Sequence, residues 1–252
     1  MEKIRKKKKR VIAIIPAYNE SKTIEKIVRE TRKYVDEVVV VDDGSSDSTG
    51  ELAKMAGAKV IKHDKNMGLG KSLRDGFSYA ISKNFDIIIT LDADGQHSPS
   101  DIPKFIEAIN EGYDFVLGER NLACYPLIKK IGNVFLNFMT NLISGTTLRD
   151  TESGFRAYTK NALKKINGYV KANRYEIACE IIFAVGYYNL KYKNVPIASD
   201  VYVKGVRVRD GIKIFLYMLR RRKRVGIKDY LIDAMYVIRK WIERLRNKLH
   251  AN

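Results

Sequence analysis

Short apolar runs alternate with amphipathic segments along the first half of the chain, and this alternation constrains the fold more than any other feature. Residues 11–15, 38–41 and 87–91 are almost wholly apolar, which is typical of strands buried on both faces. Further strands are expected at 59–61 and 113–117, and helices at 21–34, 49–56, 69–82 and 99–112. The pattern predicts an α/β fold, with a doubly wound, mostly parallel sheet and helices on both faces.

Positive charge is concentrated at the two ends of the chain, which has 252 residues and a net charge of +18. Residues 1–10 carry seven Lys or Arg and one Glu, whereas residues 203–252 carry fifteen Lys or Arg and four acids. The body between these ends is close to neutral. We therefore expect a basic arm at 1–10, one globular domain at 11–210, and a basic tail at 211–252.

The tail has the pattern of amphipathic helices. Residues 212–219 are almost wholly apolar, and residues 228–249 place an apolar stripe against a Lys- and Arg-rich back. Such helices suit an anionic membrane surface, although a docking surface for a membrane protein or a second copy would have the same pattern. An apolar stripe at 131–143 also has helical spacing, and predicts either a core helix or a helix lying in a membrane interface.

Composition narrows the compartment. The two cysteines, Cys124 and Cys179, are too few for a disulfide framework, which favours a reducing environment. No stretch has the apolar length of a signal peptide or the roughly 18 apolar residues of a membrane span. We expect a cytoplasmic protein that associates peripherally with the cytoplasmic face of a membrane.

Polar clusters follow four of the expected strands, at 16–20, 42–47, 92–97 and 118–120. Ligands of open α/β sheets bind at the carboxyl ends of the strands, so these clusters are expected to share one site. Ordinary turn chemistry explains any single cluster, because Asp, Gly and Ser are common in loops. It does not explain all four together.

Asp92 and Asp94 are the most informative pair in these clusters. Two carboxylates one residue apart, at the end of a buried strand, do not easily stay ionised together without a cation. Mg²⁺ or Mn²⁺ accepts carboxylate oxygens and phosphate oxygens together, and the Gln96 side chain offers a neutral oxygen to the same ion. The pair therefore predicts a divalent-metal site that binds a diphosphate.

With these residues in place, the chain resembles family 2 glycosyltransferases, and most closely the polyprenyl-phosphate sugar synthases of the dolichol-phosphate mannose synthase type. The ordered motifs that carry the resemblance span about 11–160 and are Ile15-Pro-Ala-Tyr-Asn-Glu20, Val41-Asp-Asp-Gly-Ser-Ser-Asp47, Asn66-Met-Gly-Leu-Gly-Lys71, Asp92 to His97, Gly118-Glu-Arg120 and Asp150-Thr-Glu-Ser-Gly-Phe-Arg156.

The resemblance implies a GT-A fold and a metal-dependent, inverting transfer from a GDP- or UDP-sugar to a polyprenyl (dolichyl) phosphate. Asp43 would then bond the base, while Asp92, Asp94 and Gln96 would hold the metal. The residues that would bind the donor nucleotide are Pro16, Ala17, Tyr18, Glu20, Val41, Asp42, Asp43, Lys71, Asp92, Ala93, Arg207 and Lys213. Arg209 could serve in place of Arg207, because residues 203–211 depart from the usual sequence of the family.

The resemblance also implies catalytic roles for Asp94, Arg120 and Asp150. A lipid phosphate is already anionic, so positioning and charge screening would supply most of the rate. Arg120, Lys129 or Lys130 would hold that phosphate. Asp150 and Glu152 either act as a base for a sugar hydroxyl or brace the loop before Gly154.

Two other functions fit part of the pattern. The same fold could transfer sugar to a soluble or protein-linked saccharide, because only the acceptor side of the site would differ. A nucleic-acid-binding protein would explain the basic ends, but its phosphate backbone would be repelled by four carboxylate-rich loops. We therefore expect no nucleic-acid partner.

Overall fold

The computed structural model describes residues 8–121, 125–199 and 217. The strands are β1 (Val11–Ala17), β2 (Glu37–Asp42), β3 (Lys59–Lys62), β4 (Ile87–Thr90), β5 (Phe115–Arg120), β6 (Arg156–Thr159) and β7 (Tyr192–Ile197). The helices are α1 (Ile24–Thr31), α2 (Thr49–Met55), α3 (Leu69–Ser82), α4 (Ile102–Asn110), α5 (Leu127–Ser144), α6 (Lys160–Tyr169) and α7 (Ile177–Tyr187). A 3-10 turn, η1 (Pro99–Asp101), precedes α4.

All seven strands form one sheet in the order β3-β2-β1-β4-β6-β5-β7. β6 runs antiparallel to β4 and β5, and every other neighbouring pair is parallel. The sheet is therefore mixed but mostly parallel, as the sequence predicts. Its direction of growth reverses between β1 and β4, which makes the crevice beside these two strands the expected ligand site.

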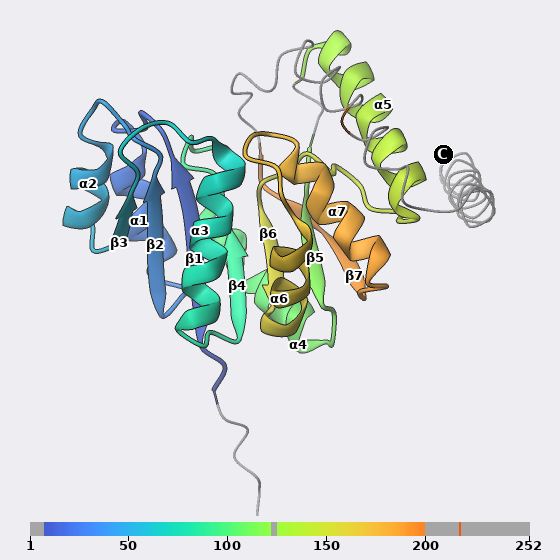
Figure 1. Ribbon diagram of the computed structural model, residues 1–252, viewed down its shortest axis with the longest axis horizontal. Coiled ribbons are helices and arrows are strands. Elements are labelled where there is room, and N and C mark those ends of the chain that lie inside the picture. Colours follow the sequence, from blue (N-terminus) through green and yellow to red (C-terminus); the bar gives the residue numbers. More distant parts are fainter. Residues whose placement is uncertain (1–7, 122–124, 200–216, 218–252) are drawn as a thin grey trace, which may run out of the picture.

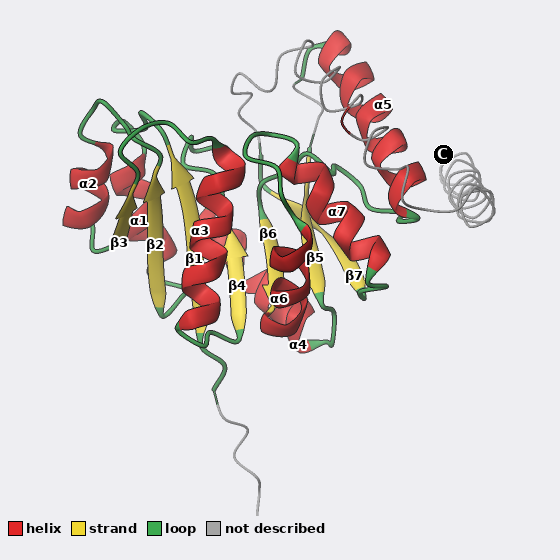
Figure 2. Ribbon diagram, viewed as in Figure 1, coloured by secondary structure: helices red, strands yellow, loops and turns green. Residues whose placement is uncertain are grey.

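Helices cover both faces of the sheet (Figures 1 and 2). On one face, α1, α2 and α4 pack against side chains such as Ala13 and Ile15 of β1. On the other face, α3, α6 and α7 pack against the alternate positions, including Ile12 and Ile14. Because successive strand residues point to opposite faces, a continuous apolar strand supplies both layers of core at once.

Helix α3 approaches the sheet closely. A Cβ atom added to Gly76 would lie 2.4 Å from the Cγ2 atom of Ile14, so only glycine allows this contact. The close packing holds the middle of α3 against β1, while the Gly68 N–H at the start of the helix donates to Asp43 after β2.

Helix α5 lies outside these two layers and packs mainly on α7 (Figure 1). A Cβ atom added to Gly186 of α7 would lie 1.8 Å from the carbonyl oxygen of Ser144. The backbones of the two helices therefore touch at Gly186, because glycine has no side chain to keep them apart. The polar side chains of α5 turn inward: Thr140 and Asn141 are buried, and the Asn141 amide donates to the Leu148 carbonyl over 2.7 Å.

The apolar residues at the start of α5 are the exposed ones. Leu127 and Ile128 are each 73% exposed, Ile131 is 61% exposed, and Val134 and Phe135 are 51% exposed. The interpretation as a core helix is wrong for Ile131, Val134 and Phe135. Together with Lys130 and Phe138, these three line a shallow groove of about 410 Å³. Later in the same stripe the interpretation holds in part, because Met139 and Ile143 pack against the buried side chains of Cys179 and Phe183. Among the described helices, none is both long and apolar enough to cross a membrane.

The basic arm at 1–10 and the tail at 211–252 are predictions that fall largely outside the described residues. Of the tail, only Tyr217 is described, and its hydroxyl donates to the buried carboxylate of Glu180. The boundaries of the domain at 11–210 therefore stay a prediction.

Candidate active site

Five polar loops meet at one edge of the sheet. β1, β2, β4 and β5 all end there, and β6 begins there because it runs in the opposite direction. The antiparallel β6 thereby brings residues 150–155 to the four clusters that follow the parallel strands. In Figure 1 these loops lie at the arrowhead end of the sheet.

Carboxylates gather at the ends of β1 and β4, where the ligand crevice is expected. Glu20 follows β1, and Asp92 and Asp94 follow β4. The Thr23 hydroxyl ties the two loops together by donating to the Ala93 carbonyl over 2.6 Å. Burial and the nearby charge of Asp94 raise the pKa of Glu20 above its ordinary value of 4.5. The crevice therefore concentrates negative charge, which favours a bound cation.

Asp92 is held from both sides. Its backbone N–H donates to Nδ1 of His97 over 3.2 Å, and burial lowers the pKa of His97, so a neutral ring is available to accept. On the other side Gly154 presses against the carboxylate: a Cβ atom there would lie 2.3 Å from Oδ1 of Asp92. His97 thus shapes the loop, and Gly154 leaves space for the carboxylate.

Asp94 and Gln96 form a short-range pair. The Gln96 backbone N–H donates to Oδ1 of Asp94 over 3.0 Å, and its side-chain amide donates to Oδ2 over 2.8 Å. Oε1 of Gln96 accepts from the Tyr125 hydroxyl over 3.2 Å. The amide oxygen therefore faces Tyr125, and Gln96 as a metal ligand stays a prediction that requires this amide to turn.

A divalent cation fits the chemistry of this crevice. Within the described part of the chain, no three His, Cys, Asp or Glu side chains gather closely enough to form a complete metal site. Mg²⁺ in nucleotide sites needs fewer protein ligands, because it uses one or two carboxylates and takes its other ligands from phosphate and water. The half-exposed side chains of Asp92 and Asp94 supply that number of carboxylates.

Arg120 and Asp150 form a buried, two-pronged ion pair. Nε and Nη2 of the guanidinium donate to Oδ2 and Oδ1 of the carboxylate, each over 2.7 Å, and the backbone N–H of Arg120 donates to Oδ2 over 3.1 Å. Burial alone would lower the pKa of Arg120, but the bonds to Asp150 raise it above its ordinary value. Arg120 is therefore a fixed cation at the end of β5.

This pairing engages both oxygens of Asp150, which favours a bracing role over a role as a base. The loop is held further by the Asn137 side chain of α5, which accepts from the Thr151 N–H over 3.1 Å. Arg156 is buried and donates to the carbonyls of Ser153 and Thr151 over 2.7 and 3.0 Å. Burial raises the pKa of Glu152, whose carboxylate accepts from the Cys179 thiol.

The predicted donor residues lie at the ends of β1, β2 and β4, apart from Lys71 on α3. Tyr18 is 47% exposed, whereas Asp42 and Asp43 are buried. Lys71 donates to both oxygens of Asp75 over 2.5 and 2.6 Å. Pro16 and Ala17 are the last two residues of β1, Val41 lies near the end of β2, and Ala93 follows β4. Arg207, Arg209 and Lys213 lie outside the described residues.

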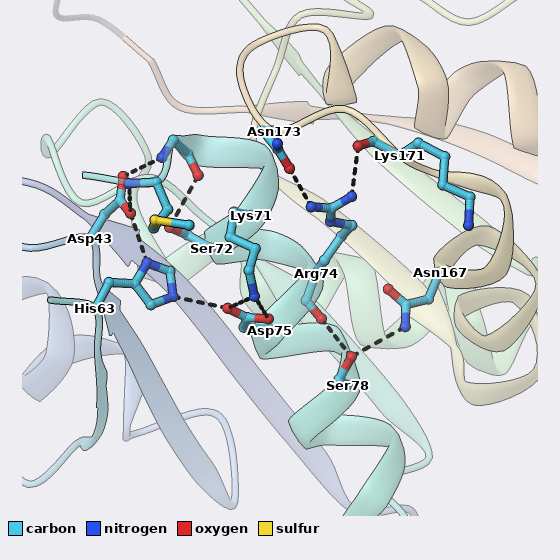
Figure 3. A network of polar contacts seen from close by, with 12 residues as sticks. Asp43, His63, Lys71, Ser72, Arg74, Asp75, Ser78, Asn167, Lys171 and Asn173 are labelled. Carbon is cyan, nitrogen blue, oxygen red and sulfur yellow. Dashed lines mark hydrogen bonds and ion pairs between the residues drawn. The ribbon is translucent and has the colours of Figure 1, made fainter. Parts of the chain in front are cut away.

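Two polar residues that sequence reasoning missed join this region. His63, directly after β3, lies between Asp43 and Asp75, with its ring nitrogens 2.7 and 2.9 Å from their carboxylates (Figure 3). The position of His63 at the end of a strand was an available signal. Its partner Asp75 is the seventh residue of α3, where no motif marks it.

Comparison with known proteins shows the family of this chain. Residues 12–167 match the model of glycosyl transferase family 2, which is more than half of the chain. The chain belongs to glycosyl transferase family 2. It is 36% identical over 240 residues to a UDP-N-acetylglucosamine–dolichyl-phosphate N-acetylglucosaminyltransferase of Methanococcus voltae, with 84% of this chain and 95% of the relative covered.

A second relative is the polyprenol monophosphomannose synthase of Mycolicibacterium smegmatis, 30% identical, with 91% of this chain and 92% of the relative covered. The fold matches glucosyl-3-phosphoglycerate synthase of Mycobacterium tuberculosis, solved with Mn²⁺ and UDP, at a TM-score of 0.68 and 17% identity, covering 86% and 81% of the two chains. The chain is therefore a glycosyltransferase with the GT-A fold, related to polyprenyl-phosphate sugar transferases.

Proposed function

We propose that this glycosyltransferase moves a sugar from a nucleotide-sugar to a polyprenyl phosphate at a membrane surface, with inversion and with the help of Mg²⁺ or Mn²⁺. The observation that carries the proposal is the position of α5. This helix exposes apolar side chains and turns its polar ones toward the loop that holds Arg120. An apolar surface and a fixed cation therefore lie on neighbouring elements.

The donor side of the proposal uses the loops after β1, β2 and β4. Asp92 and Asp94 would hold the metal, which neutralises the diphosphate as the sugar leaves. β2 lies two strands from β4, about 10 Å away at the usual strand spacing, a distance that a nucleoside bridges. Asp43, the acid at the end of β2, would therefore meet the base.

The acceptor side uses Arg120. Asp150 engages Nε and Nη2 of the guanidinium, and no described residue accepts from Nη1. A phosphate that approaches Nη1 meets a cation whose orientation is already fixed, so little ordering is required at the moment of reaction. The phosphate oxygen is anionic near neutral pH and attacks the anomeric carbon without a strong base.

The apolar start of α5 would hold the polyprenyl chain or the lipid around it. Loop 146–151 follows α5 directly, and Asn137 anchors Thr151 beside Asp150. Binding of α5 to the bilayer surface would place the headgroup of a polyprenyl phosphate beside Arg120. Peripheral association with the cytoplasmic face of a membrane, and contacts of the tail at 211–252 with lipid, a membrane protein or a second copy, belong to the same proposal.

Transfer to a soluble or protein-linked saccharide is the second candidate. It uses the same donor residues, and a neutral hydroxyl would need a base. Asp150 is engaged by Arg120, and Glu152 contacts Cys179 within the protein. The candidate is therefore less well supported than a lipid phosphate, which needs no base.

The proposal is tested by a panel of radiolabelled UDP- and GDP-sugars, with Mg²⁺ or Mn²⁺ and either a polyprenyl phosphate or a soluble oligosaccharide. We expect label to enter the organic phase, from one nucleotide sugar, only when the polyprenyl phosphate is present. Label that stays in the aqueous phase and elongates the oligosaccharide would favour the second candidate.

A further inference from the structure

Asp43 is a buried carboxylate whose acceptor sites are almost filled by the protein itself. It is 4% exposed and directly follows β2. Oδ1 accepts from Nδ1 of His63 over 2.7 Å and from the Met67 N–H over 2.8 Å. Oδ2 accepts from the Gly68 N–H, also over 2.8 Å (Figure 3).

His63 is held in place from its far side. Nε2 of its ring lies 2.9 Å from Oδ2 of Asp75, and the Lys71 ammonium group donates to both oxygens of the same carboxylate. Only 10% of the His63 side chain is exposed. Figure 3 shows the ring between the two carboxylates, with Asp43 on one side and Asp75 on the other. The imidazole therefore cannot turn away from Asp43 without losing its contact with α3.

The bonds leave Asp43 with one acceptor position. An ionised carboxylate offers about four lone pairs, two on each oxygen. His63 and Met67 occupy both positions on Oδ1, and Gly68 occupies one on Oδ2. A ligand can therefore form a single hydrogen bond with this carboxylate, through Oδ2.

Nucleobases differ in what they can donate to such a group. Uracil presents one N–H between two carbonyl oxygens, so a single acceptor satisfies it. Guanine presents a ring N–H and an amino group side by side, and a carboxylate binds that edge with both oxygens. Here Oδ1 has no position left, so the guanine amino group would lose its partner, and an unmade hydrogen bond lowers affinity.

We propose that His63, fixed by Asp75, is a specificity-determining residue that limits Asp43 to one hydrogen bond and thereby selects a uracil base, so that the donor is a UDP-sugar. This inference rests on the proposed function, in which Asp43 meets the base. It narrows the donor from two classes of nucleotide to one. His63 acts through Asp43 and has no contact with the reacting atoms.

The test compares the binding of UDP and GDP, each with Mn²⁺, to the full chain by isothermal titration calorimetry. We expect wild-type protein to bind UDP about tenfold more tightly than GDP, the value of one net hydrogen bond. His63→Ala frees a position on Oδ1, so the ratio should fall toward one. His63→Gln keeps an N–H donor and should restore the preference for UDP.

Asn167→Ala is the matched control. Asn167 donates to the Ser78 hydroxyl in the same region of α3 but has no bond to Asp43, His63 or Asp75 (Figure 3). Both affinities should be unchanged in this variant. Thermal unfolding of each variant separates loss of the fold from loss of selectivity. If His63→Ala does not fold, equal or tighter binding of GDP by the wild type still overturns the role of His63.

The results separate this inference from the proposed function. Equal or tighter binding of GDP by the wild type, or an unchanged ratio in folded His63→Ala, overturns the role of His63. In either case transfer of sugar to a polyprenyl phosphate leaves the proposed function standing. Failure of the wild type to bind either nucleotide, with no transfer from any nucleotide sugar, overturns both.

Discussion

The ion pair between Arg120 and Asp150 determines which group of the site can bind an incoming anion. Two parallel hydrogen bonds fix the plane of the guanidinium, and little solvent reaches either side chain. A carboxylate in this position cannot accept a proton from an acceptor without releasing Arg120. At the scale of single residues, Asp150 is therefore a positioning residue, and the cation that it holds is the group that we propose meets phosphate.

Asp150→Asn distinguishes these roles. The change keeps the size of the side chain but removes the charge that balances buried Arg120, so the free energy of unfolding should fall by about 3 kcal/mol. Chemical denaturation measures it. A catalytic base would behave differently: the variant would lose activity while the free energy of unfolding stayed at the wild-type value.

Asp94→Ala tests the metal assignment. Both oxygens of Asp94 accept only from Gln96 among the described residues, so the fold should survive. Transfer should fall by at least about 100-fold, because a developing charge loses its stabilising partner. Glu107→Ala, which removes an exposed acid from α4, is the control and should keep full activity. An unchanged rate of sugar transfer in folded Asp94→Ala would contradict the assignment of Asp94 as a metal ligand.

Site residues at or just after the ends of apolar strands could be predicted, because strand direction alone brings them together. Asp92, Asp94 and Arg120 are of this kind. The ion pair between Arg120 and Asp150 could not be predicted in this way. It depends on β6 running antiparallel, which brings the loop before β6 to the same edge of the sheet. The contact between His63 and Asp75 joins the end of a strand to a helix. No periodicity in the sequence indicates that these two side chains lie close together.

At the scale of elements, α5 is amphipathic in the opposite sense to an ordinary surface helix. Thr140 and Asn141 face the protein and satisfy backbone or side-chain partners, whereas Ile131 and Phe135 are exposed. Exposure of neighbouring apolar residues on one helix face is typical of a surface that binds lipid or protein. The helix itself was predictable from its spacing, but the direction of its apolar face was not.

Ile131→Ser combined with Phe135→Ser should weaken binding to anionic vesicles by at least about tenfold, because two large apolar side chains no longer leave water. The midpoint of thermal unfolding should change little, since both residues are exposed. Met55→Ser removes a side chain that is 76% exposed on α2 and serves as the control. Equal sedimentation of all three proteins with vesicles would rule out α5 as the lipid-binding element.

The contact between α5 and α7 depends on Gly186. Because a Cβ atom at this position overlaps the Ser144 carbonyl, Gly186→Ala should lower the free energy of unfolding by about 1–3 kcal/mol, the usual range for overpacking. Gly168→Ala on α6 meets no atom within 4 Å, and should be neutral or slightly stabilising. Urea denaturation of the two variants compares them directly, and equal stabilities would contradict the close packing of α5.

Most elements of the first half could be predicted, because each is either a short apolar run or a stretch with helical periodicity. Strands β1 to β5 are confirmed, with ends shifted by a few residues. The second half was harder. β6 is four residues long, and α7 is apolar on nearly all sides, so neither displays the periodicity that separates strands from helices.

At the scale of the whole molecule, a nearly neutral catalytic body lies between two strongly basic ends. Within the body, acids gather at the proposed metal site where β1 and β4 end, whereas Arg120 is held by loop 150–155. The proposed reaction follows this division: a cation and a diphosphate occupy the crevice, and a lipid phosphate approaches from the side of α5. In the proposed function, the basic ends would add attraction to an anionic membrane surface.

The most direct measurement of this account is the anomalous scattering of Mn²⁺ in crystals grown with MnCl₂ and UDP. We predict a peak within bonding distance of a carboxylate oxygen of Asp92 or Asp94. The diphosphate of UDP should supply further ligands to the ion, and the base should contact Asp43. A Mn²⁺ peak and nucleotide density away from the edge where β1, β2 and β4 end would contradict the account.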